Sequence, residues 1–225
     1  VKGGFGTAFK APTLKQISPN YVGAEGPHTF MGNADVKPET SRSFELGADW
    51  QSGPFSVRGT VFHTRVKDLI TTRLLREQGT RREYIYDNVD SATMHGAELG
   101  FGWAFAPGFK WNNDLTLLRT KDGSTGKELT DRPRHVLHSQ LAWQGASGFS
   151  ARLGVDLTGS QRTAGGARLP AYTVVNASVG QQINKLLSWR AGVDNIGNVR
   201  LAEKAADFGY AIRGRTYFVN LRADF

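Results

Sequence analysis

The chain has 225 residues, with 28 basic and 20 acidic side chains, a net charge of +8, 27 glycines and no cysteine. The lack of cysteine excludes disulfide scaffolds, thiolate metal sites and thiol nucleophiles. The mean hydropathy is −0.38, and the longest apolar run, 103–106, is far shorter than the ~20 residues of a membrane-spanning helix, which excludes a helical membrane protein. The charge alone suits nucleic acid, anionic lipid and an anionic ligand equally well.

Apolar and polar residues alternate along most of the chain. Near the second alternating segment, Phe44, Leu46 and Trp50 share one parity, whereas Glu45 and Asp49 take the other. Alternation with a period of two is typical of a strand with one apolar face. In chain order, the segments with this pattern are 1–9, 43–51, 55–67, 95–105, 109–119, 135–144, 149–160, 171–182, 188–196 and 216–225. The sequence therefore predicts an all-β protein with ten strands, each of about the ten residues that a tilted membrane strand needs.

The connections between these segments alternate in length. Short ones lie near 52–54, 106–108, 145–148 and 184–186. Long ones occupy roughly 10–41, 70–92, 120–134, 161–170 and 197–213. Short turns on one side and long loops on the other are typical of an outer-membrane barrel. A soluble sandwich of two sheets would give the same alternation within each strand, and it is the alternative reading of the pattern.

The five tryptophans favour the barrel, because all of them lie beside the short connections: Trp50, Trp103, Trp111, Trp143 and Trp189. Aromatic residues at one level of every strand are typical of the girdle at a membrane interface. In a sandwich, the same residues would instead close one end of the core. The chain also ends on Phe225, at the apolar parity that Tyr217 shares in the last segment. A terminal aromatic at this parity indicates the assembly signal of an outer-membrane barrel.

Several motifs, in order, resemble those of TonB-dependent outer-membrane receptors, over essentially the whole chain. They lie at 9–14 (FKAPTL), 32–41 (GNADVKPETS), 44–47 (FELG), 88–98 (NVDSATMHGAE), 131–135 (DRPRH), 193–196 (VDNI) and 214–218 (GRTYF). The stretch 9–21 is further similar to catecholate-siderophore receptors of the ferric-enterobactin and colicin I receptor type.

This resemblance implies that residues 1–225 form about ten C-terminal antiparallel strands of a transmembrane barrel of about 22 strands. Val1 already lies within a strand pattern, so we expect a piece of a longer protein whose plug domain, TonB box and earlier strands are absent. The implied location is the outer membrane of a Gram-negative bacterium. The implied partners are a ferric siderophore, TonB (through the missing N-terminal region), the protein's own plug, membrane lipid and lipopolysaccharide, and the barrel assembly machinery. A receptor for cobalamin, haem or another chelate is the alternative within the family.

The polar parity carries Glu45 and Glu98 together with several glycines, among them Gly96 and Gly100. In the resembling receptors this face meets the plug, so the carboxylates are candidates for pairing with plug arginines. Equally, they line a solvated interior. We interpret the glycines as leaving room for the plug.

Basic and aromatic residues concentrate in the long connections. A ferric tris-catecholate is a trianion with flat aromatic arms, for which arginine supplies charge and stacking and aromatic residues supply ring faces. Of the candidates, Tyr21, Arg81, Tyr84 and Tyr86 are preferred; the alternative is that the cations bind lipopolysaccharide phosphates or face water. The full set of candidate ligand-binding residues is Tyr21, His28, Phe30, Arg73, Arg76, Arg81, Arg82, Tyr84, Tyr86, Arg168 and Tyr210.

No catalytic constellation is found, and no cofactor is expected. His135 and His138 form an HxxH pattern, but residues i and i+3 of a strand point to opposite faces, so we expect no metal site. A stand-alone barrel protease of omptin type is the enzyme alternative. Nucleic acid is disfavoured as a partner because the polar parity carries both signs of charge, as in Arg152 and Asp156, rather than a basic face.

Overall fold

The computed structural model describes residues 1–163 and 165–223. The ten principal strands are β1 (Lys2–Lys10), β4 (Glu39–Ser52), β5 (Phe55–Gln78), β6 (Arg81–Ala106), β7 (Phe109–Asp122), β8 (His135–Gln144), β9 (Phe149–Thr158), β12 (Tyr172–Gln182), β13 (Leu187–Asp194) and β14 (Thr216–Ala223). The short elements are α1 (Leu14–Ile17), β2 (Val22–Glu25), β3 (His28–Met31), β10 (Gln161–Arg162), β11 (Arg168–Leu169) and α2 (Leu201–Lys204). All ten predicted strands are therefore confirmed.

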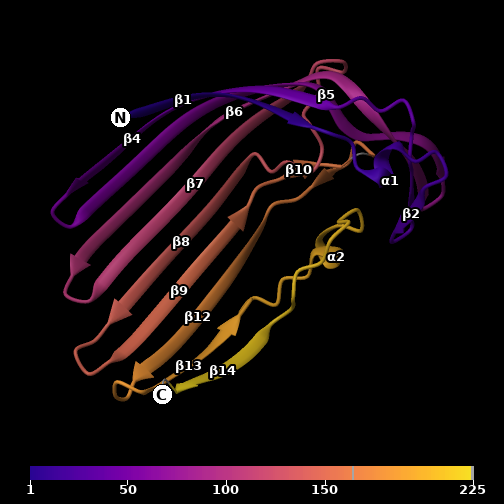
Figure 1. The fold of residues 1–225 in the computed structure, drawn as a ribbon. Helices are drawn as coiled ribbons and strands as arrows, with labels where there is room; N and C mark the ends of the chain where they lie inside the picture. Colours follow the sequence, from indigo (N-terminus) through magenta and orange to yellow (C-terminus); the bar gives the residue numbers. More distant parts are fainter. Residues whose placement is uncertain (164, 224–225) are drawn as a thin grey trace.

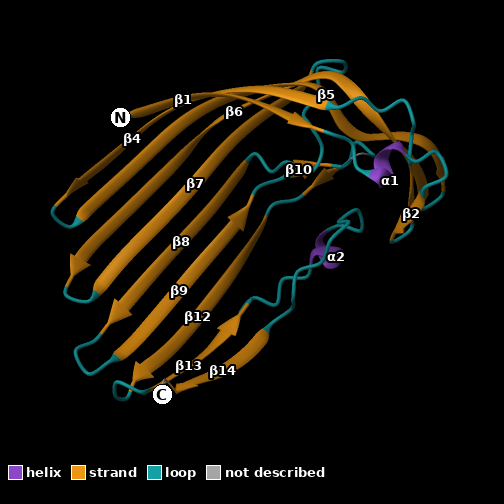
Figure 2. Ribbon diagram, viewed as in Figure 1, coloured by secondary structure: helices purple, strands orange, loops and turns teal. Residues whose placement is uncertain are grey.

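The principal strands form one sheet in the order β1-β4-β5-β6-β7-β8-β9-β12-β13-β14. Each of these neighbours is antiparallel. The sheet is strongly curved, with β1 at one edge and β14 at the other (Figures 1 and 2). Strands β2 and β3 form a small hairpin, and β3 runs parallel beside the outer part of β6. No described helix is long and apolar enough to span a membrane.

The apolar parity lies on the outside of the curve and is uncovered. Phe44 is 54% exposed, Leu99 48% and Val219 73%. The cluster of buried apolar residues is small by comparison and centres on Val66 and Ala92 under Leu129. A sandwich would bury the apolar parity between two sheets, whereas in the described residues no second sheet packs against it. The alternative of a soluble sandwich is therefore wrong.

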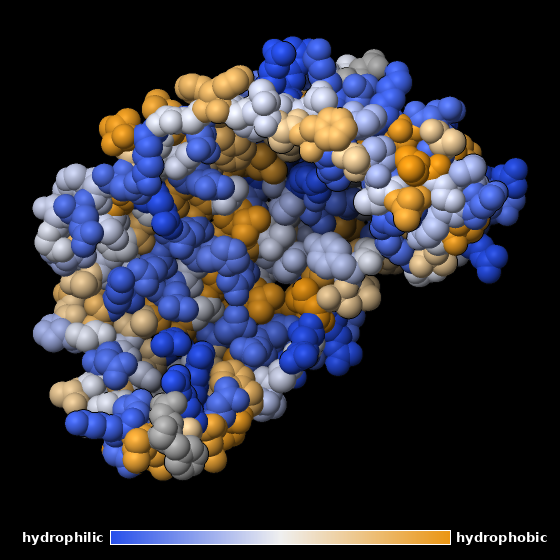
Figure 3. Space-filling view, viewed as in Figure 1, coloured by the Kyte–Doolittle hydropathy of each residue, from blue (hydrophilic) through white to orange (hydrophobic). Residues whose placement is uncertain are grey.

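The polar parity lines the hollow of the sheet, where hydrophilic residues cover much of the surface (Figure 3). The Arg58 guanidinium of β5 reaches across β6 and donates to Asp114 of β7 at 2.7 Å. Gly100 lies between them, and a Cβ there would stand 3.0 Å from Arg58 Nε and 3.2 Å from Asp114 Oδ1. The absent side chain is what lets this ion pair cross the intervening strand.

At several inward glycines, neighbouring groups of the same chain occupy the space that a side chain would take, which refines the interpretation of these glycines as room for a separate domain. A Cβ on Gly96 would collide with the Leu117 carbonyl oxygen and stand 2.8 Å from the Phe62 ring. A Cβ on Gly192 would stand 2.6 Å from the Phe218 ring. Aromatic rings that cover strand glycines in this way protect the backbone and help to set the register.

The connection expected at 70–92 is not a loop. Strands β5 and β6, of 24 and 26 residues, pair as far as Gln78 opposite Arg81, with one bulge between Leu74 and Arg76. The prediction was wrong because this part carries charged residues on both faces and so lacks the alternation by which strands are recognised. Such a hairpin extends beyond any hydrocarbon layer, since a tilted membrane strand needs only about 9–11 residues.

The tryptophans do lie beside the short turns. Phe55 stacks on Trp103 at 5.6 Å between ring centroids, and Phe109 lies 6.2 Å from Trp143. Two of these turns need glycine, because Gly108 and Gly148 have φ values of 77° and 78°. The role of this aromatic row as a membrane girdle stays a prediction. Tyr217 is 72% exposed on β14, and Phe225 lies outside the described residues.

We predict that Gly96→Ala in the full-length protein lowers the free energy of unfolding by about 1–3 kcal/mol, the usual cost of overpacking. The added methyl would have to displace a backbone carbonyl and an aromatic ring. Gly154→Ala is the matched control on the same face, since a Cβ there meets nothing closer than 4.0 Å. Urea unfolding in lipid vesicles measures both variants, and an equal effect of the two would contradict this explanation of the inward glycines.

Candidate functional site

The long connections gather at the end of the sheet opposite the short turns, together with the outer part of the β5–β6 hairpin (Figure 2). We call this end the rim and define it as residues 11–38, 68–91, 123–134, 159–163, 165–171 and 195–215. All eleven candidate ligand-binding residues lie in it. The structure divides them into groups with different surroundings, which the sequence could not show.

One group is aromatic and holds the β2–β3 hairpin against β6. The Phe30 ring stacks on Tyr84, with centroids 5.2 Å apart and planes at 17°. The His28 ring meets the Tyr84 ring edge-on at 5.8 Å. Tyr84 is only 4% exposed, so its ring supports Phe30 and His28 from beneath. The Tyr21 hydroxyl lies against Gly23, at the start of the same hairpin.

A second group consists of the arginines of the β5–β6 hairpin, which differ in their partners. Arg73 Nε donates to Asp87 Oδ2 at 2.8 Å, and Arg76 lies 4.0 Å from Glu83. Arg82 donates to Glu77 at 3.3 Å and to Asp207 at 3.2 Å.

Arg81, at the tip, is exposed and has no ion-pair partner in the described part of the chain. It is therefore the cation of this hairpin most available to a ligand.

Arg82 connects three segments of the rim that are far apart in sequence. Asp207 belongs to the connection that carries α2, and Gly165 lies so close that a Cβ there would stand 2.7 Å from Arg82 Nη1. Burial acts to lower the pKa of Arg82, but the hydrogen bonds to Glu77 and Asp207 raise it above its ordinary value. Arg82 therefore keeps its positive charge, and its contacts with Glu77 and Asp207 hold these segments of the rim together.

A cavity of about 290 Å³ lies between the turn of the β2–β3 hairpin and the tip of the β5–β6 hairpin. His28, Arg76, Arg81 and Arg82 line it, together with Glu83. The cavity thus brings together four of the predicted residues from two separate connections. Three of them are cations, so the cavity is suited to an anion.

Tyr210 belongs to a further aromatic group, at the C-terminal side of the rim. Its ring lies 5.6 Å from Phe208, which lies 6.1 Å from Tyr172. Gln161 donates to the Tyr210 hydroxyl at 3.1 Å. Burial, followed by the hydrogen bond with Tyr172, raises the pKa of Tyr210 to about 12. Sequence reasoning missed Gln161 and Tyr172, because nothing local links them to a residue so far along the chain.

Arg168 belongs to none of these groups. Its Nε donates to Ser160 Oγ at 3.1 Å, and its guanidinium is 3.9 Å from Glu128. Glu128 also accepts from Arg134 Nε at 2.6 Å. A cavity of about 390 Å³ lies nearby, lined among others by Arg73 and Arg162. Tyr86 is half-buried, and its carbonyl oxygen accepts a hydrogen bond from Asn33.

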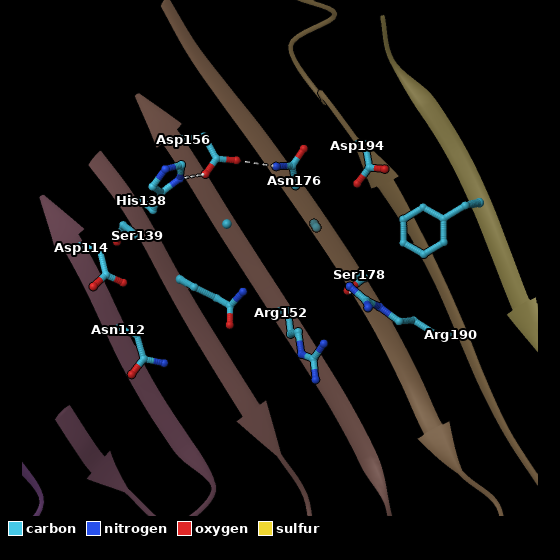
Figure 4. A pocket seen from close by; sticks show the side chains of 14 residues that line it. Asn112, Asp114, His138, Ser139, Arg152, Asp156, Asn176, Ser178, Arg190 and Asp194 are labelled. Carbon is cyan, nitrogen blue, oxygen red and sulfur yellow. Dashed lines mark hydrogen bonds and ion pairs between the residues drawn. The ribbon is translucent and has the colours of Figure 1, made fainter. Parts of the chain in front are cut away.

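The hollow of the sheet holds a polar depression of about 450 Å³ that the sequence did not single out as a site (Figure 4). His138 and Asp156 lie 2.6 Å apart, and Asn176 donates to Asp156 at 3.0 Å. Arg152 points into the hollow and has no hydrogen bond or ion pair within the described chain. No group of three potential metal ligands occurs in residues 1–163 and 165–223.

Two predictions about inward residues can be followed further. His138 lies on the polar face, whereas His135 lies on the other face beside Gly159, as a strand requires. Glu45 and Glu98 are exposed towards the hollow, and neither has an ion-pair partner in the described residues. Their carboxylates are therefore free to meet a separate polypeptide.

Comparison with known proteins shows which family model and which proteins this chain is similar to. The model of the family "TonB dependent receptor-like, beta-barrel" matches residues 1–196. The ferric enterobactin receptor of Pseudomonas aeruginosa is 30% identical over 100% of this chain and 36% of its own length. The ferrienterobactin receptor of Escherichia coli is 26% identical, with the same two coverages. The chain thus spans about a third of the length of the relatives it matches.

A solved structure extends the likeness to three dimensions. It is a mutant of the ferric enterobactin receptor of Pseudomonas aeruginosa in complex with enterobactin. Its TM-score is 0.77 at 26% identity, over 99% of this chain and 38% of that one.

We predict that Tyr84→Ala in the full-length protein loosens the β2–β3 hairpin. It removes the ring on which Phe30 and His28 pack, and truncation of a buried aromatic costs about 3–5 kcal/mol. Amide hydrogen exchange of residues 22–31 measures the effect, which should be a faster exchange confined to this segment. Ile85→Ala, on the opposite face of β6, is the control, and equal acceleration by both variants would contradict this role for Tyr84.

Proposed function

The chain belongs to the TonB-dependent receptor-like β-barrel family, and we propose that it forms the C-terminal part of a barrel that takes up a ferric siderophore. The barrel lies in the outer membrane of a Gram-negative bacterium. Its ten strands are the last part of a larger barrel whose remaining strands and plug belong to the rest of the protein. The observation that carries this proposal is the single curved sheet, apolar outside and polar inside, with every long connection at one rim.

The rim suits a catecholate complex better than a neutral ligand. A ferric tris-catecholate carries three negative charges and flat rings, which attract guanidinium groups and aromatic faces. The cavity lined by Arg76, Arg81 and Arg82 supplies the charge, and Phe30 and His28 supply ring surfaces beside it. This concentration of positive charge favours a ferric catecholate over cobalamin or haem. That the matched receptors are named for ferric enterobactin supports the same choice.

The predicted residues take different parts in this proposal. Arg81 and Arg76 contact the ligand, together with the exposed surfaces of His28 and Phe30. Arg82 and Tyr84 hold the rim in shape, because the first is bound to two carboxylates and the second is buried. Tyr21, Arg73, Tyr86, Arg168 and Tyr210 remain candidates for contacts made as the ligand enters from other sides of the rim.

The inward face is the wall against which the plug rests. Glu45 and Glu98 are unpaired carboxylates on that wall, and arginines of the plug are their proposed partners. TonB acts on the N-terminal region, outside this chain, and its pull rearranges the plug so that the ligand passes along the wall. No catalytic role is proposed for any residue, since the matched relatives are transport receptors.

The rim assignment is tested with Arg81→Gln and Arg76→Gln in the full-length receptor. We expect each variant to weaken the binding of ferric enterobactin about tenfold, which corresponds to the loss of about 1.4 kcal/mol of charge-assisted contact. Isothermal titration in detergent measures the dissociation constant. Lys110→Gln, close to the short turns, is the control that removes a cation from the other end of the sheet.

Wild-type affinity in both arginine variants would contradict the rim assignment. Failure of the unaltered receptor to bind ferric enterobactin, with tight binding of cobalamin or haem, would contradict the choice of ligand.

A further inference from the structure

The outward face of β4 to β7 changes from apolar to basic at one level of the sheet. The strand registers place outward residues side by side in rows, and Leu46, Val61, Ala97 and Leu117 form the last fully apolar row. The next row contains Phe44, His63, His95 and Arg119. The row beyond it contains Arg42, Arg65, Thr93 and Lys121. We call the last two rows the basic rows.

The cations of the basic rows have no counter-charge. Arg42, Arg65, Arg119 and Lys121 are exposed, and none has a hydrogen bond or ion pair within residues 1–163 and 165–223. The rows contain no acidic residue, and the His63 and His95 rings stack on each other with centroids 6.2 Å apart. Several cations of the inward face differ in this respect, as Arg58 does with Asp114 at 2.7 Å.

This arrangement is unfavourable for a sheet on its own. Arg42 stands directly opposite Arg65 on the neighbouring strand. Side chains in such positions have Cβ atoms about 4.5–5.5 Å apart, and like charges there destabilise the pair. An anion between the two guanidinium groups would reverse the sign of the interaction. Phosphate suits the position, because arginine binds its oxygens through two parallel hydrogen bonds.

The basic rows lie at the height at which a membrane has its headgroups. From Trp103, beside the short turns, to His95 is eight residues along β6. At about 3.3 Å per residue and a strand tilt of roughly 40°, these residues cover about 20 Å of membrane thickness. The outward apolar band of such barrels is about 25 Å tall. The basic rows therefore begin where the hydrocarbon ends on the rim side.

We propose that the basic rows bind the phosphate groups of lipopolysaccharide in the outer leaflet. Arg42 of β4 and Arg65 of β5 hold one phosphate between them, and Arg119 and Lys121 bind a second on β7, on the other side of β6. The acyl chains of the same lipid lie along the apolar rows below. The inference rests on the proposed outer-membrane location, but it is independent of the siderophore that the rim binds.

The test uses the full-length receptor in detergent, with native mass spectrometry as the readout of lipid binding. One variant carries Arg42→Gln, Arg65→Gln, Arg119→Gln and Lys121→Gln. The control carries Lys15→Gln, Lys110→Gln, Lys185→Gln and Lys204→Gln, which remove the same charge from other surfaces. The probes are bis-phosphorylated lipid A, dephosphorylated lipid A and inorganic phosphate.

We expect lipid A to bind the wild type and the control with equal affinity, and the basic-row variant at least about tenfold more weakly. Dephosphorylated lipid A should bind the wild type as weakly as lipid A binds the variant. Unchanged lipid A affinity in the variant would overturn the proposal. So would inorganic phosphate that competes fully with the lipid, since the site would then be one for free phosphate.

Folding and function are followed separately in the same samples. Heat-modifiable gel migration shows that the barrel is intact, and ferric enterobactin binding by the basic-row variant should be unchanged, because its four substitutions lie outside the rim. If the wild-type receptor does not bind ferric enterobactin, that result counts against the proposed function alone and leaves the proposed lipid site untouched. If the fourfold variant does not fold, the pairs Arg42→Gln with Arg65→Gln and Arg119→Gln with Lys121→Gln are measured, and wild-type lipid A affinity in both would overturn the proposal.

Discussion

The structure depends on one contact, that between the outside of a curved sheet and a hydrocarbon surrounding. Leu99 on β6 and Val219 on β14 are typical of outward side chains that nothing in the described chain covers. A sheet with such a face is stable only if water is kept from it, and the buried apolar cluster around Ala92 is too small to supply the stability itself. With lipid outside, the polar parity is left to line the hollow, and both the wall and the rim follow from that division.

The strands and their facing could be predicted from the sequence because both depend on local alternation. Phe44, Leu46 and Trp50 already share a parity in the sequence, and the structure places them on one face. Alternation did not reveal the strands at 70–92, because β5 and β6 carry charged residues on both faces there. The hairpin that they form continues far beyond the membrane. There, pairing between the two strands maintains the structure in place of an apolar face.

The candidate site could be predicted only as a set of residues in long connections. Which of them meet depends on contacts between distant parts of the chain, such as Phe30 on Tyr84 and Arg82 on Asp207. No short-range pattern distinguishes the buried Tyr84 from the exposed Arg81. The same limit applies to Gly100, whose lack of a side chain is explained by an ion pair between two other strands. The basic rows, likewise, could be recognised only once the pairing register of strands β4 to β7 was known.

The measurement that tests the central claim most directly is the environment of neighbouring outward and inward side chains. The chain has no cysteine, so Leu99→Cys and Glu98→Cys, made in the full-length receptor in lipid vesicles, provide adjacent sites for a spin label. We predict that the label at 99 collides often with oxygen dissolved in the lipid and is shielded from a water-soluble nickel chelate, whereas the label at 98, which faces the interior, meets little of that oxygen. A label at 98 that collides with the lipid oxygen as often as the one at 99 would contradict the account.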